Sequence, residues 1–167
     1  MNMIIIKKSG FLFFNKKKYR CALGLSGIKK NKIEGDSATP SGTYKLIKLY
    51  YRKDKINFIK SNIIKKIIKK NTGWCDDVKS RFYNKEIKLP NKYSHERFYR
   101  NDDIYDIICV LNYNTKPIVK GKGSAIFIHI AKKKFTNTKG CVALKKKDLI
   151  YILSKIKKNT KIKILEN

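Results

Sequence analysis

Short apolar runs separated by turn residues constrain the fold of this chain more than any other feature. Such runs, bounded by Gly, Asn, Asp or Ser, are typical of β-strands. The first two are interrupted at Ser9–Gly10 and Asn15–Lys16. The pattern predicts a loop over residues 35–42 and strands over residues 3–7, 11–15, 18–23, 43–51, 103–112, 123–130 and 160–165. It therefore favours a mainly β fold, a β-sandwich with a few peripheral helices.

Two segments have the apolar spacing of an amphipathic helix. Residues 147–157 carry Asp148 near their start, where a negative charge suits the helix dipole. Residues 57–71 place five isoleucines on one helical face, with lysines around them: Ile59, Ile63, Ile64, Ile67 and Ile68. A basic amphipathic helix can lie on a membrane surface, but we favour a helix that packs on the domain with its lysines in solvent.

The length of the chain suits one domain. A chain of 167 residues can bury a substantial core, and no linker or internal repeat divides it. Its hydrophobic fraction of 42% excludes a mostly disordered chain. We therefore expect a single domain over residues 1–167, and we expect it to be a monomer.

The net charge of +29 is the feature that misleads most easily. Clustered positive charge can indicate a polyanionic partner. Here the excess is nearly all Lys, since Arg occurs only at positions 20, 52, 81, 97 and 100, and the chain is also rich in Ile and Asn. These residues share codons rich in A and T, so a biased genome explains the charge. Arg is the residue that phosphate and base recognition favour, so we expect no specific nucleic-acid partner.

The sequence shows neither a signal peptide nor a membrane anchor. The apolar runs at residues 3–6 and 11–14 are too short for the hydrophobic part of a signal peptide. A transmembrane helix needs about 18 consecutive apolar residues, and no run of that kind is present. We expect a cytoplasmic protein, or a periplasmic or cell-wall protein if an unrecognised export route operates.

One histidine and one cysteine of the chain could form a nucleophile and its base. The run from Gly121 to His129 predicts a strand that ends near a histidine, and Cys141 follows twelve residues later in the turn-like segment Lys139-Gly140-Cys141. An imidazole beside a thiol can generate the nucleophilic thiolate near neutral pH. Taken separately, a lone Cys and a lone His are more often core residues.

The surrounding motifs resemble a known family. The segments Gly123-Ser124-Ala125-Ile126-Phe127-Ile128-His129 and Gly140-Cys141-Val142-Ala143-Leu144 are similar to the active-site signature of the L,D-transpeptidase catalytic domain, also called YkuD. Upstream, Thr39-Pro40-Ser41-Gly42-Thr43-Tyr44 resembles its Thr-Pro-x-Gly-x-aromatic motif. Further segments fit the short, single-domain branch: Cys21–Gly24, Gly73–Asp77, Tyr83-Asn84, Leu89-Pro90, Ser94–Glu96 and Tyr105-Asp106. The resemblance implies a YkuD-like β-sandwich.

Two departures from the commoner family pattern concern the substrate. Many members have His before the Gly-Cys pair and Arg soon after it, whereas this chain has Lys139 and Ala143 at these positions. The spacing between His129 and Cys141 is also shorter than in the more familiar transpeptidases. A short loop there suggests a more open or differently shaped acceptor side, with the nucleophile and base intact.

The resemblance implies an enzyme that acts on peptidoglycan stem peptides or muropeptides. Cys141 would attack the carbonyl of an L-residue and release the following D-amino acid, with His129 as base. The N–H groups of Cys141 and of Gly140 or Lys139 would bind the oxyanion. An amine acceptor gives a transpeptidase, and water gives a cytoplasmic L,D-carboxypeptidase of wall recycling. A non-catalytic basic module that binds nucleic acid or other anions is the remaining alternative.

Four other residues are candidates for substrate binding. Ser124 and Thr138 could donate hydrogen bonds to the substrate or to the catalytic pair. Arg100 could bind the carboxylate of the stem peptide and Trp74 could stack along it, although a structural ion pair and a core indole are equally good interpretations. The Thr39–Gly42 turn is interpreted first as a tight turn and second as a frame for the substrate.

The remaining cysteines and histidine have structural interpretations. Cys21 and Cys109 lie in strand-like runs and are predicted core residues, and Cys75 could lie at the edge of a cleft. The sequence shows no zinc-ligand spacing and no support for a disulfide, so we expect no metal and no organic cofactor. His95 has no nucleophile near it in sequence and is interpreted as a structural or cleft-wall residue.

Overall fold

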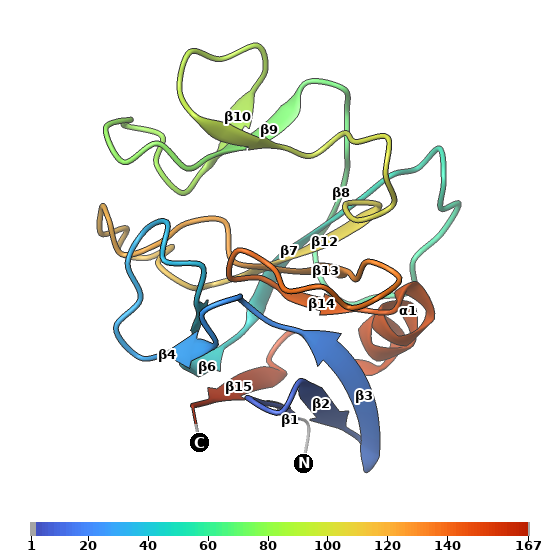
Figure 1. The fold of residues 1–167 in the computed structure, drawn as a ribbon. Coiled ribbons are helices and arrows are strands. Elements are labelled where there is room, and N and C mark those ends of the chain that lie inside the picture. Colours follow the sequence, from blue (N-terminus) through green and yellow to red (C-terminus); the bar gives the residue numbers. More distant parts are fainter. Residues whose placement is uncertain (1–2, 167) are drawn as a thin grey trace.

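A large curled sheet dominates the protein, which is seen here in a computed structural model that describes residues 3–166. Figure 1 shows the arrangement. In order across the sheet, its ten strands are β6 (Gly42–Tyr44), β15 (Lys161–Leu165), β1 (Met3–Lys7), β2 (Phe11–Phe14), β3 (Lys17–Ala22), β14 (Val142–Leu144), β13 (Phe127–Ile130), β12 (Ile107–Leu111), β7 (Leu46–Tyr51) and β8 (Lys65–Ile67). The prediction of a mainly β fold is confirmed.

The large sheet folds back on itself as a sandwich. Its strands β6 and β7 are separated in sequence by Lys45 alone, yet β6 pairs with β15 near one end of the strand order and β7 pairs with β12 near the other. The sheet must therefore curl until its two ends meet. Strands β1, β2 and β15 form one layer and β12, β13 and β14 the layer above it (Figure 1).

The alternation of side chains along β12 explains why both faces of the upper layer are buried. Ile107, Cys109 and Leu111 point into the aliphatic core between the two layers. Ile108 and Val110 point the other way, into a second and more aromatic core. A strand buried on both faces reads as a continuous apolar run, which is what residues 107–111 present.

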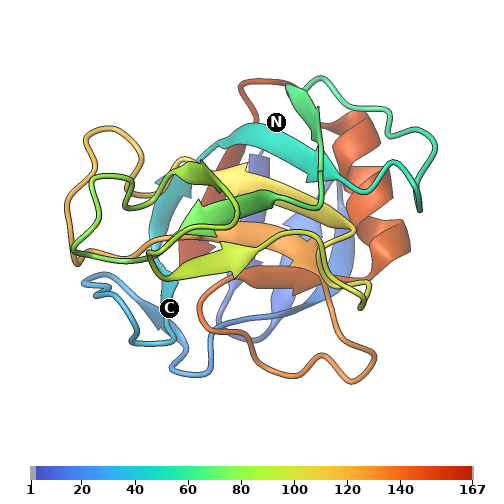
Figure 2. The same cartoon turned by 90° about the horizontal axis from the view of Figure 1, so that it is seen from above.

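The second core lies beneath a small separate sheet. This three-stranded sheet consists of β10 (Glu86–Lys88), β9 (Thr72–Cys75) and β11 (His95–Arg97). It forms a further layer above β12 and β13 (Figures 1 and 2). Trp74 and Phe98 extend from this side and pack with Phe127 of β13 at ring-centroid distances of 5.5 Å each.

The only helix within residues 3–166 is α1 (Lys146–Lys155), so the prediction of a few peripheral helices is wrong in number. Its buried residues Leu149, Ile152 and Leu153 follow the spacing of one helical face and join the aliphatic core. The predicted Asp148 does lie in its first turn. A pair of two-residue strands, β4 (Ile28–Lys29) and β5 (Thr39–Pro40), completes the fold.

The predicted helix over residues 57–71 is wrong. The segment is extended, and its residues 65–67 form β8 at the edge of the large sheet, parallel to β7. Ile59 and Ile63 are buried in one core and Ile68 in the other, while Ile64 remains 63% exposed. Because Ile is β-branched and favours strands, the open edge of β7 provides a better partner than a helical face.

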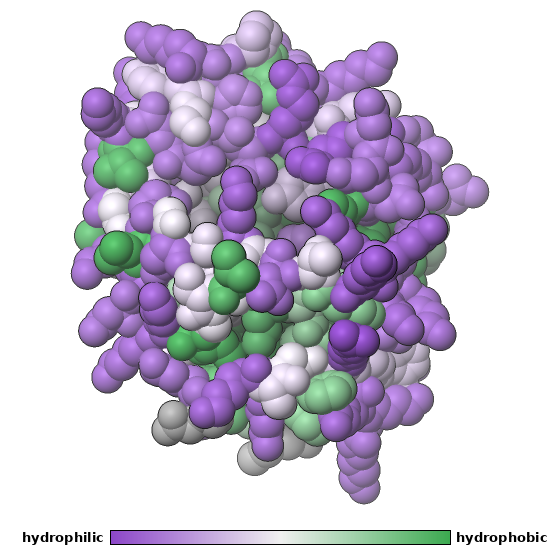
Figure 3. Space-filling model, viewed as in Figure 1, coloured by the Kyte–Doolittle hydropathy of each residue, from purple (hydrophilic) through white to green (hydrophobic). Residues whose placement is uncertain are grey.

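The surface of the molecule is dominated by hydrophilic side chains. Figure 3 shows them over most of the visible face, with small apolar areas between them. Within residues 3–166, no helix is both long and apolar enough to cross a membrane.

Candidate active site

His129 is oriented by the strand that carries it. It lies on β13 two residues after Phe127, so both side chains point to the upper, aromatic side of the sheet. Nδ1 of His129 lies 2.9 Å from the carbonyl oxygen of Ile130. A carbonyl oxygen can only accept, so Nδ1 carries the proton and Nε2 is left as the basic nitrogen. A backbone carbonyl therefore orients this ring.

Cys141 lies immediately before β14, which runs parallel to β13 with Ile128 opposite Val142. This pairing brings the thiol beside the start of β13. The N–H of Phe127 donates to Sγ of Cys141 at 3.4 Å, and the thiol donates to the carbonyl oxygen of Ala125 at 3.2 Å. Cys141 and His129 both line one cavity of about 650 Å³.

Burial keeps both groups of this pair neutral at rest. It raises the pKa of the Cys141 thiol to about 12 and lowers the pKa of the His129 imidazole to about 4. A charged form in such surroundings loses hydration that the site only partly replaces. The cavity is therefore lined by a protonated thiol, which bonds to backbone groups of Ala125 and Phe127, and by a neutral imidazole.

The loop before Cys141 is held by Thr138. Its hydroxyl donates to the carbonyl oxygen of Cys141 at 2.6 Å and accepts from the N–H of Gly140 at 3.1 Å. Thr138 thus bonds to backbone groups of the nucleophile loop, and its contact with a substrate stays a prediction. Because the Gly140 N–H is engaged in this way, the candidate oxyanion donors that remain are the N–H groups of Cys141 and Lys139.

Gly140 is required by its surroundings. Its φ is +132°, and a Cβ at this position would lie 2.7 Å from the carbonyl oxygen of Ala38. Ala38 precedes the Thr39-Pro40 motif, and the hydroxyl of Thr39 accepts from the N–H of Gly24 at 2.9 Å. The turn interpretation of this motif thus acquires a specific role, since the turn supports the nucleophile loop from behind.

Trp74 is a core residue. It is 6% exposed, does not line the cavity, and packs with Phe98 and Phe127. Its indole N–H donates to Oδ1 of Asn84 at 2.9 Å. The tentative prediction that Trp74 stacks on a substrate is therefore replaced by the core interpretation.

Asn84 is a residue whose role sequence reasoning missed. Its Oδ1 also accepts from the N–H of Ala125 at 3.0 Å, and its Nδ2 donates to the carbonyl oxygen of Asn114 at 2.7 Å. Ala125 has φ +51°, a conformation that is unfavourable for a residue with a Cβ. Asn84 helps to hold it there, which directs the Ala125 carbonyl to the thiol. The resemblance included Tyr83-Asn84, but nothing in the sequence indicated this contact.

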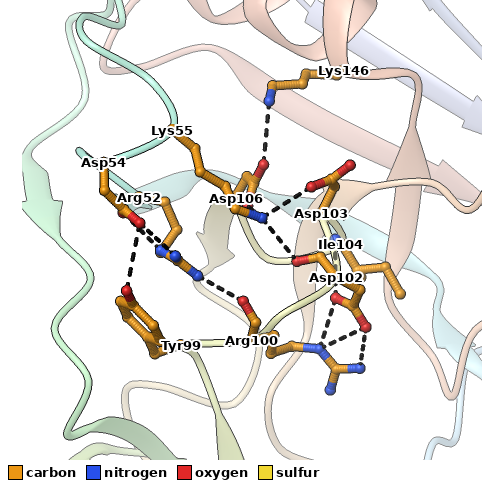
Figure 4. A network of polar contacts seen from close by, with 10 residues as sticks. All are labelled: Arg52, Asp54, Lys55, Tyr99, Arg100, Asp102, Asp103, Ile104, Asp106 and Lys146. Carbon is orange, nitrogen blue, oxygen red and sulfur yellow. Dashed lines mark hydrogen bonds and ion pairs between the residues drawn. The ribbon is translucent and has the colours of Figure 1, made fainter.

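Arg100 lines the cavity and is also part of an ion pair, so its structural interpretation holds and its binding of a substrate carboxylate stays a prediction. Its guanidinium contacts Asp102 at 2.6 Å and lies over the ring of Tyr105 at 5.3 Å. Its carbonyl oxygen accepts from Nη1 of Arg52 at 2.6 Å. Arg52 in turn pairs with Asp54. The side of the cavity that Arg100 occupies is therefore held by charged groups from the segment that follows β7 (Figure 4).

The same wall is anchored at its other end by Asp106, which is 1% exposed. Its carboxylate lies 3.1 Å from Nζ of Lys55 and 3.2 Å from Nζ of Lys146 (Figure 4). Between the anchors lies Tyr105, whose ring packs edge-on against His129 at a centroid distance of 5.3 Å. Sequence reasoning gave Tyr105 no role, because its meeting with His129 depends on two distant segments.

Of the remaining predicted residues, Ser124 and Lys139 line the cavity and His95 does not. Ser124 is 6% exposed, and its hydroxyl has no hydrogen-bond partner within residues 3–166. Lys139 contributes its side chain to the rim and is exposed. His95 does not line the cavity, and its Nδ1 lies 2.6 Å from the carbonyl oxygen of Tyr93, as a structural residue would. All four cysteines are free.

Comparison with protein families identifies the class of this domain. The model of the L,D-transpeptidase catalytic domain, YkuD, matches residues 2–164. The chain therefore belongs to the L,D-transpeptidase catalytic domain family. No curated protein matches it at a significant level.

Several solved structures of L,D-transpeptidases are similar to this chain at very low identity. The enzyme from Mycobacterium smegmatis is 8% identical over 98% of this chain and 58% of its own, with a TM-score of 0.46. L,D-transpeptidase 1 from Mycobacterium tuberculosis is 9% identical over 98% of this chain and 60% of its own, with a TM-score of 0.44. An L,D-transpeptidase in complex with imipenem is 9% identical over 98% of this chain and 58% of its own, with a TM-score of 0.45. This chain thus spans 58% to 60% of the length of these proteins.

Proposed function

We propose that this domain is a cysteine-dependent acyl transferase of peptidoglycan stem peptides, with Cys141 as nucleophile and His129 as base. The observation that carries the proposal is the shared cavity, which Cys141 and His129 line together with Nε2 of the imidazole unprotonated. Family membership supports the L,D-transpeptidase type of reaction.

In the first half-reaction, the Cys141 proton passes to Nε2 of His129 and the sulfur attacks the carbonyl carbon of an L-residue. The N–H groups of Cys141 and Lys139 would stabilise the resulting oxyanion. Collapse of the tetrahedral intermediate breaks the carbon–nitrogen bond, and His129 returns the proton to the leaving amine of the D-residue. The product is a thioester on Cys141 and a free D-amino acid.

The second half-reaction decides which enzyme this is. An amine of another stem peptide would attack the thioester and give a crosslink, whereas water would give a shortened peptide. In either case His129 accepts a proton from the acceptor and the thiol is restored. We place transpeptidation first and hydrolysis, as by a cytoplasmic L,D-carboxypeptidase, second. The cytoplasmic location and the monomeric state stay predictions.

Mass spectrometry of the protein with a tetrapeptide or disaccharide-tetrapeptide tests the proposal. We expect loss of the terminal D-residue with the unmodified protein, and a tripeptide or a dimer as the product that distinguishes the two acceptors. Replacement of His129 by Gln should slow the reaction by about 100-fold or more, because general-base assistance is lost.

Two results would count against the proposal. The first is release of the D-residue by a Cys141→Ala protein, which would assign the chemistry to another group. The second is the absence of both product and acyl-enzyme mass in folded protein, together with salt-sensitive binding of nucleic acid. That combination would favour the basic binding module.

A further inference from the structure

In the described part of this basic chain, some carboxylates form ion pairs with Lys or Arg, and others do not. Six of the twelve form ion pairs with Lys or Arg: Asp36, Asp54, Glu86, Asp102, Asp103 and Asp106. Glu34, Asp76 and Glu96 line the active-site cavity, and none of these three has such a partner within residues 3–166. The hydroxyl of Tyr83 donates to Glu34. Asp76 and Glu96 therefore face the cavity without an ion pair within residues 3–166, in a protein with a net charge of +29.

Strand pairing places Asp76 and Glu96 side by side on the roof of the cavity. Glu96 of β11 lies opposite Trp74 of β9, and Asp76 follows Trp74 by two residues. The N–H of Asp76 donates to the carbonyl oxygen of Ser94 at 3.2 Å, which extends this pairing. Side chains two residues apart share a face, and such diagonal neighbours lie about 7 Å apart. Both carboxylates thus share the face of Trp74, which is directed toward β13.

Polar atoms of two residues that line the cavity lack partners. Oδ1 of Asp76 and Oγ of Ser124 are buried and have no hydrogen-bond partner within residues 3–166. Ser124 is 6% exposed and lines the cavity. Glu96 accepts only a long contact of 3.4 Å, from the hydroxyl of Tyr105. A buried polar atom without a partner carries a desolvation cost, and a ligand that brings N–H donors would offset it.

The opposite charge occupies other walls of the same cavity. Arg100 lies on the wall formed by residues 99–106, and Lys132 and Lys139 lie on the loop that leads to Cys141. The carboxylates of Asp76 and Glu96 thus lie at the small sheet, whereas Arg100, Lys132 and Lys139 lie on other walls, and Glu34 adds a carboxylate that is bonded to Tyr83. A ligand with a positive and a negative group fits this arrangement better than a simple anion does.

We propose that Asp76 and Glu96, with Ser124, form a subsite for a primary ammonium group on the side chain of a stem peptide. The inference rests on the proposed function, since it names a group that the same cavity recognises. The ammonium donates up to three hydrogen bonds and neutralises the two carboxylates. It enters with the peptide whose L-residue is attacked or with the acceptor stem.

Occupation of this subsite would also ease the first chemical step. Burial is the main cause of the raised pKa of Cys141, and the charge of Glu96 contributes in the same direction. A cation bound between Glu96 and Asp76 would offset that charge. Thiolate formation would then be favoured when a peptide with the ammonium is in place.

Binding to the Cys141→Ala protein tests the subsite without turnover. Calorimetry would compare two tetrapeptides that differ only in whether the side-chain amine of the L-residue is free or acetylated. We expect the free amine to bind about tenfold more tightly, which corresponds to about 1.4 kcal/mol. The added substitutions Asp76→Asn and Glu96→Gln should remove the difference. Asp77→Asn is the matched control, because Asp77 is adjacent but does not line the cavity.

Equal binding of the two peptides, or binding of neither, overturns the subsite. With Cys141 present, slower D-residue release by the double variant would assign the ammonium to the donor peptide, and a loss of crosslinked product alone would assign it to the acceptor. If both steps keep their rates, the subsite is excluded. Failure of the proposed function has a separate signature, which is no D-residue release by protein with intact Asp76, Glu96 and Cys141.

Discussion

The two faces of β13 have different roles. Ile128 and Ile130 point down into an aliphatic core closed by α1, whereas Phe127 and His129 point up toward aromatic rings and the cavity. Successive residues of one strand therefore serve stability and chemistry in turn. The face of β13 that carries His129 is thus supported by a packed core on the opposite face.

Two cysteines differ in the same way, since one lies in the lower core and the other at the cavity. Cys109 is fully buried in the lower core, and burial raises the pKa of its thiol far above the usual range. Cys141 is half-buried at the cavity beside the strand that carries His129. Both thiols are protonated at rest, so access and the neighbouring base make the difference between an inert and a reactive cysteine.

The largest expected effect comes from replacing each of these two cysteines by alanine in turn. Cys141→Ala should reduce D-residue release by at least about 1,000-fold, because the nucleophile is lost, while the free energy of unfolding changes little. Cys109→Ala should destabilise the protein by about 1 kcal/mol through a small cavity and retain activity. Product analysis and urea unfolding of both variants measure this, and equal loss of activity in both would contradict the division of labour.

A truncation in the lower core should affect stability alone. Leu153 of α1 is fully buried, so Leu153→Ala is expected to lower the free energy of unfolding by about 3 kcal/mol. Urea denaturation measures this loss. The rate at which iodoacetamide alkylates Cys141 in the folded protein should stay the same, and a parallel fall in that rate would show that the two faces are coupled.

Acid should lower the free energy of unfolding through protonation of His129, which lies on the upper face of β13. Its pKa falls from 6.5 to about 4 on folding, so the unfolded chain binds the proton more readily. The stabilisation is complete above pH 6.5 and is lost as the pH falls through about 4, with a total of about 3 kcal/mol. Unfolding of wild type and His129→Gln across this range isolates the effect, because acid weakens other ion pairs in both proteins. Parallel profiles would disprove it.

The smallest expected effect concerns the wall that carries Tyr105. Asp106→Asn leaves Lys55 and Lys146 without their buried partner and should cost about 1 kcal/mol, since both lysines are partly exposed and screened. Asp103→Asn is the control, because Asp103 is 75% exposed and pairs with the same Lys55. Thermal unfolding compares the two. A cost of equal size in the control would show that burial of the pair is unimportant.

Some features of the site could be predicted because they are local. The pairing of His129 with Cys141 follows from two adjacent segments, and Gly140 marks the sharp turn between them. The engaged N–H of Gly140 was not foreseeable, because the hydroxyl of Thr138 had equally good partners in the sequence. The same limit applies to Trp74, whose indole could pack inside or face a ligand until the position of the small sheet was known.

The sequence by itself determined the alternation of apolar residues, and with it a mainly β fold and the strand that presents His129. Side-chain period along a strand is a local property, so it can be read without partners. Only the tertiary structure decided that residues 57–71 join a sheet edge, that Asn84 holds Ala125, and that Asp76 and Glu96 line the same cavity as the thiol. These outcomes depend on which distant segments compete for the same hydrogen bonds and the same buried space, and that competition is settled only when the whole chain packs.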